Sequence, residues 1–298
     1  MYSKLLSIHT EDRDITKYPQ SSNFAIELPI EYKNVYSIKL IDIELPSNYY
    51  VFSEVNQNTK MTVRVGTVTK TITISEGTYS PTQLALELTG QLNLSFNEFS
   101  VIFNSATMKF VFSCSTPFTF IFTEPETYVG NSFYDQYTQW GLGSYLGFSK
   151  KKYTSTYYTN YPIFPESVMI NNANVIETPF TSSVFGDSHI YMELDQYNSM
   201  DEIEPYTCRS SNMFYAKYGG KHNSSFAKIP MLGKSNEKMY TSKEGFLFNL
   251  FYSEPPLERI QKLKFKFRYH DGRPIDFGTT NFSFTLEFKL AKEYIKNK

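Results

Sequence analysis

The residues that could carry catalysis or hold a metal are few in this sequence, and their spacing matches no familiar site. No two of its four histidines have the spacing of zinc ligands; they are His9, His189, His222 and His270. His270 is followed by Asp271 and Gly272, which is typical of a turn between strands. Neither a nucleophile elbow nor a His-Glu-x-x-His sequence occurs. We therefore expect no enzymatic activity, no cofactor, no metal and no small-molecule substrate.

A basic strand is the first of two patterns with the chemistry of a contact surface. Between residues 262 and 269 cations alternate with apolar residues, so at the two-residue period of a strand the cations share one face; they are Lys262, Lys264, Lys266 and Arg268. A solvated outer face, with lysines guarding a strand edge, is the simplest interpretation. Four like charges repel each other, however, so we expect contact with an anionic partner: an acidic protein surface, a membrane or a genome.

Clustered tyrosines form the second pattern. They lie near proline-containing turns, where side chains are commonly exposed; they are Tyr49, Tyr50, Tyr157, Tyr158 and Tyr161. Tyrosine combines an apolar ring with a polar tip and is enriched at protein interfaces. The alternative is local packing beneath loops, and the sequence favours neither.

The overall charge favours association over nucleic-acid binding. The chain has 29 Lys and Arg against 30 Asp and Glu, a net charge of −1. A free-standing nucleic-acid-binding protein is usually strongly basic. A net charge near zero removes the self-repulsion that keeps proteins apart. Aromatic residues make up 17% of the chain, which suits β-sheets, although an A/T-rich genome would also enrich tyrosine and phenylalanine.

Cysteine usage and the N-terminus indicate a reducing compartment. Cys114 and Cys208 match no zinc or redox spacing, and we expect two free thiols. No apolar run approaches the length of a membrane span. Residues 1–14 carry charges where a signal peptide needs an apolar core. We expect the protein to stay in the cytosol or in a particle assembled there.

Apolar alternation predicts many short strands and one long helix. Residues 22–28 form a strand that Pro29 ends, and residues 35–45 form a longer one with a bulge near Leu40 and Ile41. Residues 1–21 have the character of an extended polar arm. Ser80 as N-cap and Pro81 at the first helical position predict a helix over 80–93. Hairpins flank this helix on both sides.

The order of these elements predicts a mainly β fold: a jelly-roll-like antiparallel β-sandwich with an inserted β-β-α-β-β unit. We expect residues 1–57 and 187–298 to form one discontinuous sandwich domain. The insertion should span residues 58–150, and residues 151–186 should be an extended connecting segment. For residues 124–186 the sequence leaves two alternatives: short strands that it does not place, or loops ordered by contacts with other chains.

Five parts of the chain carry a family resemblance: residues 18–29 (YPQSSNFAIELP), 32–46 (YKNVYSIKLIDIELP), 72–84 (ITISEGTYSPTQL), 145–148 (YLGF) and 271–277 with 282–288 (DGRPIDF, FSFTLEF). These parts resemble virion structural proteins of giant nucleocytoplasmic large DNA viruses, whereas residues 150–245 have no such likeness. The resemblance implies a minor capsid or penton-type protein with a jelly-roll-like fold, and it brings no catalytic residues.

The resemblance also implies partners and a location. Such a protein packs with the major capsid protein and other minor capsid proteins, associates with itself, and stabilises the icosahedral shell of a virion assembled in the host cytoplasm. The alternative class is a carbohydrate-binding or host-attachment β-sandwich of the tail or fibre type, in which exposed tyrosines stack on sugars. The capsid class and the attachment class can be distinguished by whether the tyrosine-rich loops contact protein chains or form an open groove.

Overall fold

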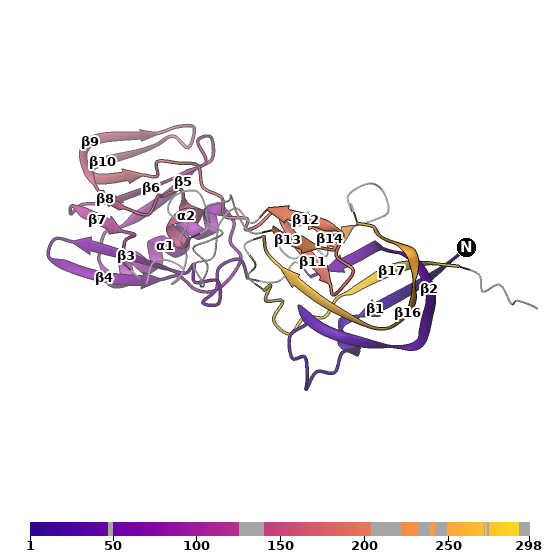
Figure 1. Ribbon diagram of the computed structural model, residues 1–298. Coiled ribbons are helices and arrows are strands. Elements are labelled where there is room, and N and C mark those ends of the chain that lie inside the picture. The colour runs from indigo at the N-terminus through magenta and orange to yellow at the C-terminus, as the bar shows by residue number, and fades with distance from the viewer. Residues whose placement is uncertain are drawn as a thin grey trace, which may run out of the picture. The chain divides into compact units, whose positions relative to one another are not determined.

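The computed structural model describes residues 1–46, 50–124, 140–203, 222–231, 239–241, 249–270, 272 and 274–291. These residues form two compact units, Met1–Tyr49 with Asp187–Lys298, and Tyr50–Gly186 (Figure 1). The mainly β, antiparallel fold predicted from the sequence is confirmed, as is the inserted β-β-α-β-β unit. The insertion begins at Tyr50, a few residues before the expected residue 58.

One seven-stranded antiparallel sheet forms the framework of the first unit. Its strands, in spatial order, are β1 (Tyr2–His9), β17 (Ser283–Leu290), β2 (Asn23–Leu45), β16 (Phe251–Arg268), β11 (His189–Leu194) and β14 (Ala227–Pro230), with β15 (Met239–Thr241) paired to β2. The short strands β12 (Met200–Ile203) and β13 (His222–Ser225) form a separate two-stranded sheet, and a 3-10 turn, η1 (Thr10–Asp12), follows β1.

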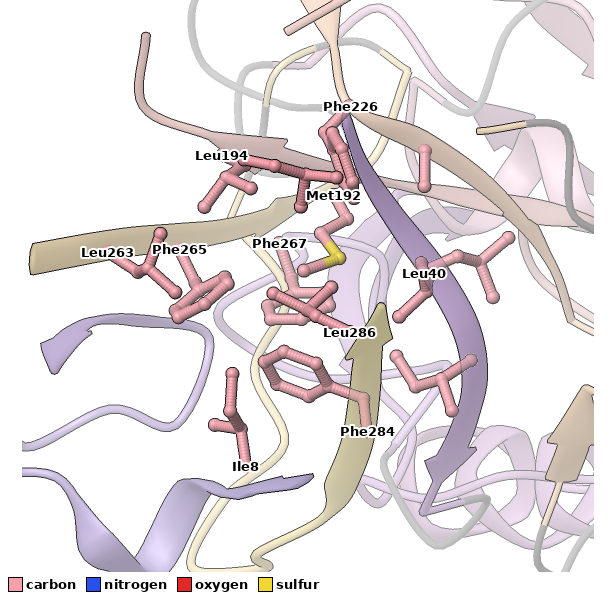
Figure 2. Packing of buried hydrophobic residues seen from close by; sticks show 14 of the residues in the cluster. Ile8, Leu40, Met192, Leu194, Phe226, Leu263, Phe265, Phe267, Phe284 and Leu286 are labelled. Atoms are coloured by element: carbon pink, nitrogen blue, oxygen red, sulfur yellow. The ribbon is translucent and has the colours of Figure 1, made fainter. Parts of the chain in front are cut away.

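Strand β2 curves along its 23 residues and folds this sheet over its own core (Figure 1). Its residues 23–38 pair with β16 on one side, and its residues 35–44 pair with β17 on the other. The rings of Phe265 on β16 and Phe284 on β17 consequently meet in the interior, with centroids 5.0 Å apart. Figure 2 shows them pointing toward the same centre as Leu40 and Met192. This arrangement is consistent with a jelly-roll-like sandwich.

The prediction that Pro29 ends a strand is wrong, because Pro29 lies inside β2. Along the ladder with β16, Tyr32 pairs with Ile260 whereas Glu27 pairs with Lys262, so the register shifts between them. Pro29 lies within that irregular stretch, where a missing N–H removes no ladder hydrogen bond. The two predicted strands are therefore one long strand with a local distortion.

The predicted bulge near Leu40 and Ile41 is confirmed. Leu40 pairs with Leu286 of β17 and Asp42 pairs with Thr285, which leaves Ile41 as the extra residue. Such an insertion changes the phase of the strand. It explains why the apolar alternation of the sequence shifts at this point.

The polar arm expected at residues 1–21 is wrong for its first part. Residues 2–9 form β1 and pair with β17 in unbroken register. Leu5 points to solvent and interrupts the apolar alternation, which hid this strand in the sequence. The segment after β1 is held by Arg13, whose guanidinium donates to the carbonyl oxygen of Thr10 at 2.5 Å and to Oδ1 of Asn281 at 2.7 Å.

Two four-stranded sheets and helix α1 (Pro81–Ser95) make up the second unit. One sheet has the order β4 (Val68–Thr73), β3 (Lys60–Val65), β7 (Phe118–Ile121) and β8 (Lys152–Thr154), and the other has β5 (Ser100–Asn104), β6 (Lys109–Cys114), β10 (Val168–Glu177) and β9 (Thr156–Ile163). Residues 151–186 are therefore not a connecting segment, because β8, β9 and β10 complete both sheets. Their pattern was hidden because β9 is exposed along most of its length.

Helix α1 begins where the sequence predicted. The Ser80 side chain accepts a hydrogen bond from the Gln83 N–H at 3.2 Å, and the Gln83 side chain accepts one from the Ser80 N–H at 2.9 Å. This reciprocal pair is a capping box. Leu84, Leu88 and Leu92 are all buried on one face, as their spacing predicted.

Gly147 is expected to tolerate no side chain. It ends the short helix α2 (Leu142–Leu146) at φ +97°, and an added Cβ would lie 2.2 Å from the carbonyl oxygen of Phe180. We expect Gly147→Ala to lower the unfolding free energy by about 2–4 kcal/mol, from backbone strain and overpacking together. The control is Gly66→Ala, because Gly66 has φ +57° and nothing within 4 Å of an added Cβ. Equal losses in urea denaturation would contradict the role of the Phe180 contact.

Candidate interaction surfaces

Three of the five candidate tyrosines lie on a strand, not in turns. Tyr157, Tyr158 and Tyr161 all belong to β9, which pairs with β10 in continuous register from Thr156 to Ile163. Among the described residues, the outer edge of β9 has no strand paired to it. The interface candidates chosen from the sequence therefore come together on one sheet edge, although the local structure differs from the turns that we expected.

Residues 156–177, the β9–β10 hairpin, carry almost no charge. Their only charged side chains are Glu166 in the turn and Glu177 at the end. Large apolar or aromatic side chains are nevertheless exposed: Tyr157 (57%), Tyr158 (39%), Phe164 (69%), Val168 (36%) and Met169 (51%). Depletion of charge with enrichment of tyrosine, phenylalanine and methionine is the composition of an interface core.

Tyr161 holds the tyrosine cluster in place. Its hydroxyl donates to Oε2 of Glu177 at 3.0 Å, and its ring makes an edge-to-face contact with Tyr158 at 5.0 Å. Burial, and after it the nearby Glu177 carboxylate, raise the pKa of Tyr161 to about 12, so its ring stays neutral and hydrogen-bonded. The Tyr157 hydroxyl is 3.3 Å from Oδ1 of Asn172 on β10. The exposed rings are thus already oriented by the hairpin.

The other two candidate tyrosines are not part of this cluster. Tyr50 is 54% exposed at the start of the second unit. Its carbonyl oxygen accepts a hydrogen bond of 3.5 Å from the Asn56 side chain. Tyr49 lies outside the described residues. The structure therefore brings together Tyr157, Tyr158 and Tyr161.

The four-cation face predicted on β16 is wrong at Arg268. That side chain is 1% exposed, and its guanidinium donates to Oε1 of Glu202 on β12 at 2.6 Å and to Glu193 on β11. It also lies over the ring of Tyr191, 5.2 Å from the centroid. Burial opposes the charge, but hydrogen bonds to the two carboxylates raise the pKa of Arg268 above its usual value. Arg268 is a structural ion-pair residue and not a contact residue.

Lys266 is also paired within the chain. Its Nζ lies 3.5 Å from Oε2 of Glu193. The sequence did not identify Glu193 and Glu202 as partners of Arg268. Each lies more than 60 residues before Arg268 in the sequence, and only the folded sheets bring them together. Their one signal was the outward position of Glu193 in the apolar alternation of 190–194. Lys262 and Lys264 remain the exposed cations of this face.

A cleft of about 550 Å³ lies beside β1, the segment after it and the first part of β2. Its apolar wall includes Leu6 and Ile26, and its charged lining mixes both signs: Asp12, Asp14, Lys17, Glu27 and Lys262.

In the parts of the chain that the structure describes, no group of three or more His, Cys, Asp or Glu is placed to hold a metal ion. The helices in those parts include none that is long and apolar enough to span a membrane.

This chain is similar to one family model and to solved structures. A scan of family models matches residues 3–252 to the "Family of unknown function (DUF5901)". Among solved structures, the crystal structure of the SeMet-labeled mavirus penton protein aligns over 97% of this chain and 99% of that chain, at 12% sequence identity and a TM-score of 0.45. No curated protein matches.

Proposed function

Because this chain belongs to the DUF5901 family, a family of unknown function, we propose a role from its own surfaces: it is a structural protein of a virus particle. In this proposal it is a minor capsid or penton-type component of the virion, and it packs with the major capsid lattice to stabilise an icosahedral shell. The observation that carries the proposal is the β9–β10 hairpin, a pre-oriented and nearly uncharged surface of exposed aromatic and apolar side chains.

The chemistry of this hairpin favours a protein partner. Residues 168–173 of β10 pair with β9 alone, so this part of the hairpin is a two-stranded ribbon, which is marginally stable by itself. Packing against a neighbouring chain would remove the rings of Tyr157 and Tyr158 and the side chain of Met169 from water. Such rigid aromatic anchors contribute most of the binding energy in protein interfaces. The resemblance of five sequence segments to virion structural proteins supports the same class of partner.

A sugar-binding role has less support. Aromatic rings that stack on sugars usually line a groove, and the cleft of the first unit is lined by Tyr18 alone among tyrosines. Tyr157 and Tyr158 instead lie on an open strand edge. The edge of a sheet offers backbone donors and acceptors to another strand. We therefore favour the capsid role over the attachment role.

Lys262 and Lys264 supply a second, smaller contact surface in this proposal. Both are exposed on β16. They share a face of this strand with Lys266 and Arg268, whose charges are paired with Glu193 and Glu202. An anionic partner, such as an acidic capsid surface or an inner membrane, would be attracted to them. That attraction would weaken with salt, because exposed charges are screened beyond about 8 Å at physiological ionic strength.

The proposal predicts that the hairpin tyrosines are needed for incorporation into particles. Truncating an interface hot spot costs about 2 kcal/mol or more, and 1.4 kcal/mol is a factor of ten. We therefore expect Tyr157→Ser with Tyr158→Ser to lower the amount of chain per purified particle by at least about tenfold. Quantitative mass spectrometry of the particles, with circular dichroism of the purified variant, measures this result.

The matched control is Tyr252→Ser. Tyr252 is 57% exposed, as is Tyr157, but it lies on β16 next to charged residues such as Glu254. We expect this variant to enter particles normally. Normal incorporation of a folded Tyr157→Ser/Tyr158→Ser chain would contradict the proposed interface. The same assay tests the second surface with a variant that carries Lys262→Glu and Lys264→Glu. Full incorporation of this variant at low salt would contradict a contact through these two lysines.

A further inference from the structure

The partner of β9 can be specified more closely than as a capsid chain. We propose that the open edge of β9 pairs with β9 of a second copy of this chain, so that two hairpins form one continuous antiparallel sheet. This inference rests on the proposed function, because it names the partner of the same hairpin. It is carried by a comparison of β9 with the other sheet edges of the described residues.

The other described edges of the three larger sheets each have a feature that blocks pairing. Edge strands β1, β4, β8 and β14 each carry a lysine: Lys4, Lys70, Lys152 and Lys228. Lysine on an edge is a common device against pairing with another chain. Two edges remain. Strand β5 is covered by helix α1, whose Thr89 hydroxyl accepts a hydrogen bond of 3.0 Å from the Val101 N–H, and β15, which pairs only with β2, is three residues long and too short to template another strand.

Strand β9 has none of these protecting features. It has eight residues, Thr156–Ile163, and none of them is charged. Its tyrosines and threonines suit an extended strand. Pro162 cannot donate to a ladder, so it limits pairing to residues 156–161. Within the described residues, β9 is thus the longest sheet edge without a charge, and its unblocked part is long enough for several ladder hydrogen bonds.

A second copy is the occupant that this surface fits best. A two-fold interface brings the same patch of both copies together. A charged residue on that patch would therefore lie close to the same charge on the other copy and be repelled by it. Strand β9, which has no charged residue, avoids this repulsion, whereas the lysine-bearing edges would not. An antiparallel pair centred on Thr159 would place Tyr157 opposite Tyr161 of the other copy. Cross-strand aromatic pairs of this kind stabilise sheets.

The test is the oligomeric state of the purified full-length chain. Thr159 is exposed on β9, and Thr69 is exposed on the lysine-protected edge β4. In sedimentation-velocity measurements we expect a concentration-dependent dimer for the parent chain and for Thr69→Lys. Thr159→Lys should be monomeric, with its dimer dissociation constant raised at least about tenfold. A monomeric parent chain, or a folded Thr159→Lys chain that dimerises normally, would overturn the proposal.

A second variant keeps the test independent of folding. Opposed residues of antiparallel strands have Cα atoms about 4.5–5.5 Å apart, within the range of a disulfide. Under mild oxidation we expect Thr159→Cys to form a cross-linked dimer on non-reducing gels, and the parent and Thr69→Cys chains to form none. Should Thr159→Cys stay monomeric while Tyr157→Ser/Tyr158→Ser still abolishes incorporation, the hairpin would bind a different capsid chain. In that case the proposed function would stand and this inference would fail.

Discussion

Leu88→Asp is expected to unfold the Tyr50–Gly186 unit. Leu88 is 1% exposed on the buried face of α1, among Leu84 and Leu92. A carboxylate at this position would be removed from water without a partner, which costs several kcal/mol or more. The loss of apolar contacts adds to that cost. In urea denaturation followed by circular dichroism, we expect a separate, early transition or no folded baseline for this unit.

The same helix supplies the matched control. Leu86 lies two residues away and is 68% exposed. Leu86→Asp introduces the same charge into the same helix but buries nothing, so it should change stability by no more than about 0.5 kcal/mol. If both variants unfolded alike, the helix would not face the sheet as described. If neither did, Leu88 would not be a core residue.

Arg268→Leu is expected to lower the unfolding free energy of the first unit by about 3–5 kcal/mol. Within the part of the chain that the structure describes, the substitution leaves the Glu202 carboxylate, whose side chain is 5% exposed, with only the weaker contact to Nδ1 of His270 at 3.3 Å. Removing one partner of a buried ion pair leaves the other charge desolvated and uncompensated. The midpoint of guanidinium unfolding measures the loss.

Two comparisons separate this effect from the loss of an ordinary surface contact. Arg259 is 70% exposed and lies 3.9 Å from Glu31, so Arg259→Leu should cost no more than about 1 kcal/mol. Adding Glu202→Leu to Arg268→Leu removes the unpaired carboxylate and should restore much of the stability. A double variant as unstable as Arg268→Leu alone would show that the buried charge is not the cause.

The parts of the fold that the sequence predicted are those with a strong local pattern. Helix α1 followed from Ser80, Pro81 and the leucine spacing because capping and one-sided burial are both local properties. The bulge at Ile41 followed from the change of apolar phase within β2. Strands β8 to β10 could not be placed from the sequence, because β9 buries almost none of its side chains and therefore has no alternation to detect.

The candidate surfaces divide in the same way. Tyr157, Tyr158 and Tyr161 were selected from residue type alone, and their shared position on β9 depends on pairing with β10. Arg268 was misassigned because strand periodicity shows which side of a strand a residue faces, but not what covers that side. Glu202 covers it from a segment 66 residues away in the sequence. Contacts of this range come from tertiary packing and have no local signature.

The central claim, that the chain is a structural component of a virus particle, is tested most directly by its presence in purified particles. Particles from a culture that produces the chain would be separated on a density gradient, and the chain and the major capsid protein quantified by mass spectrometry in each fraction. We predict that the chain follows the particle peak at a constant ratio to the major capsid protein. Recovery of the chain only in the soluble fractions, with intact particles that lack it, would contradict the account.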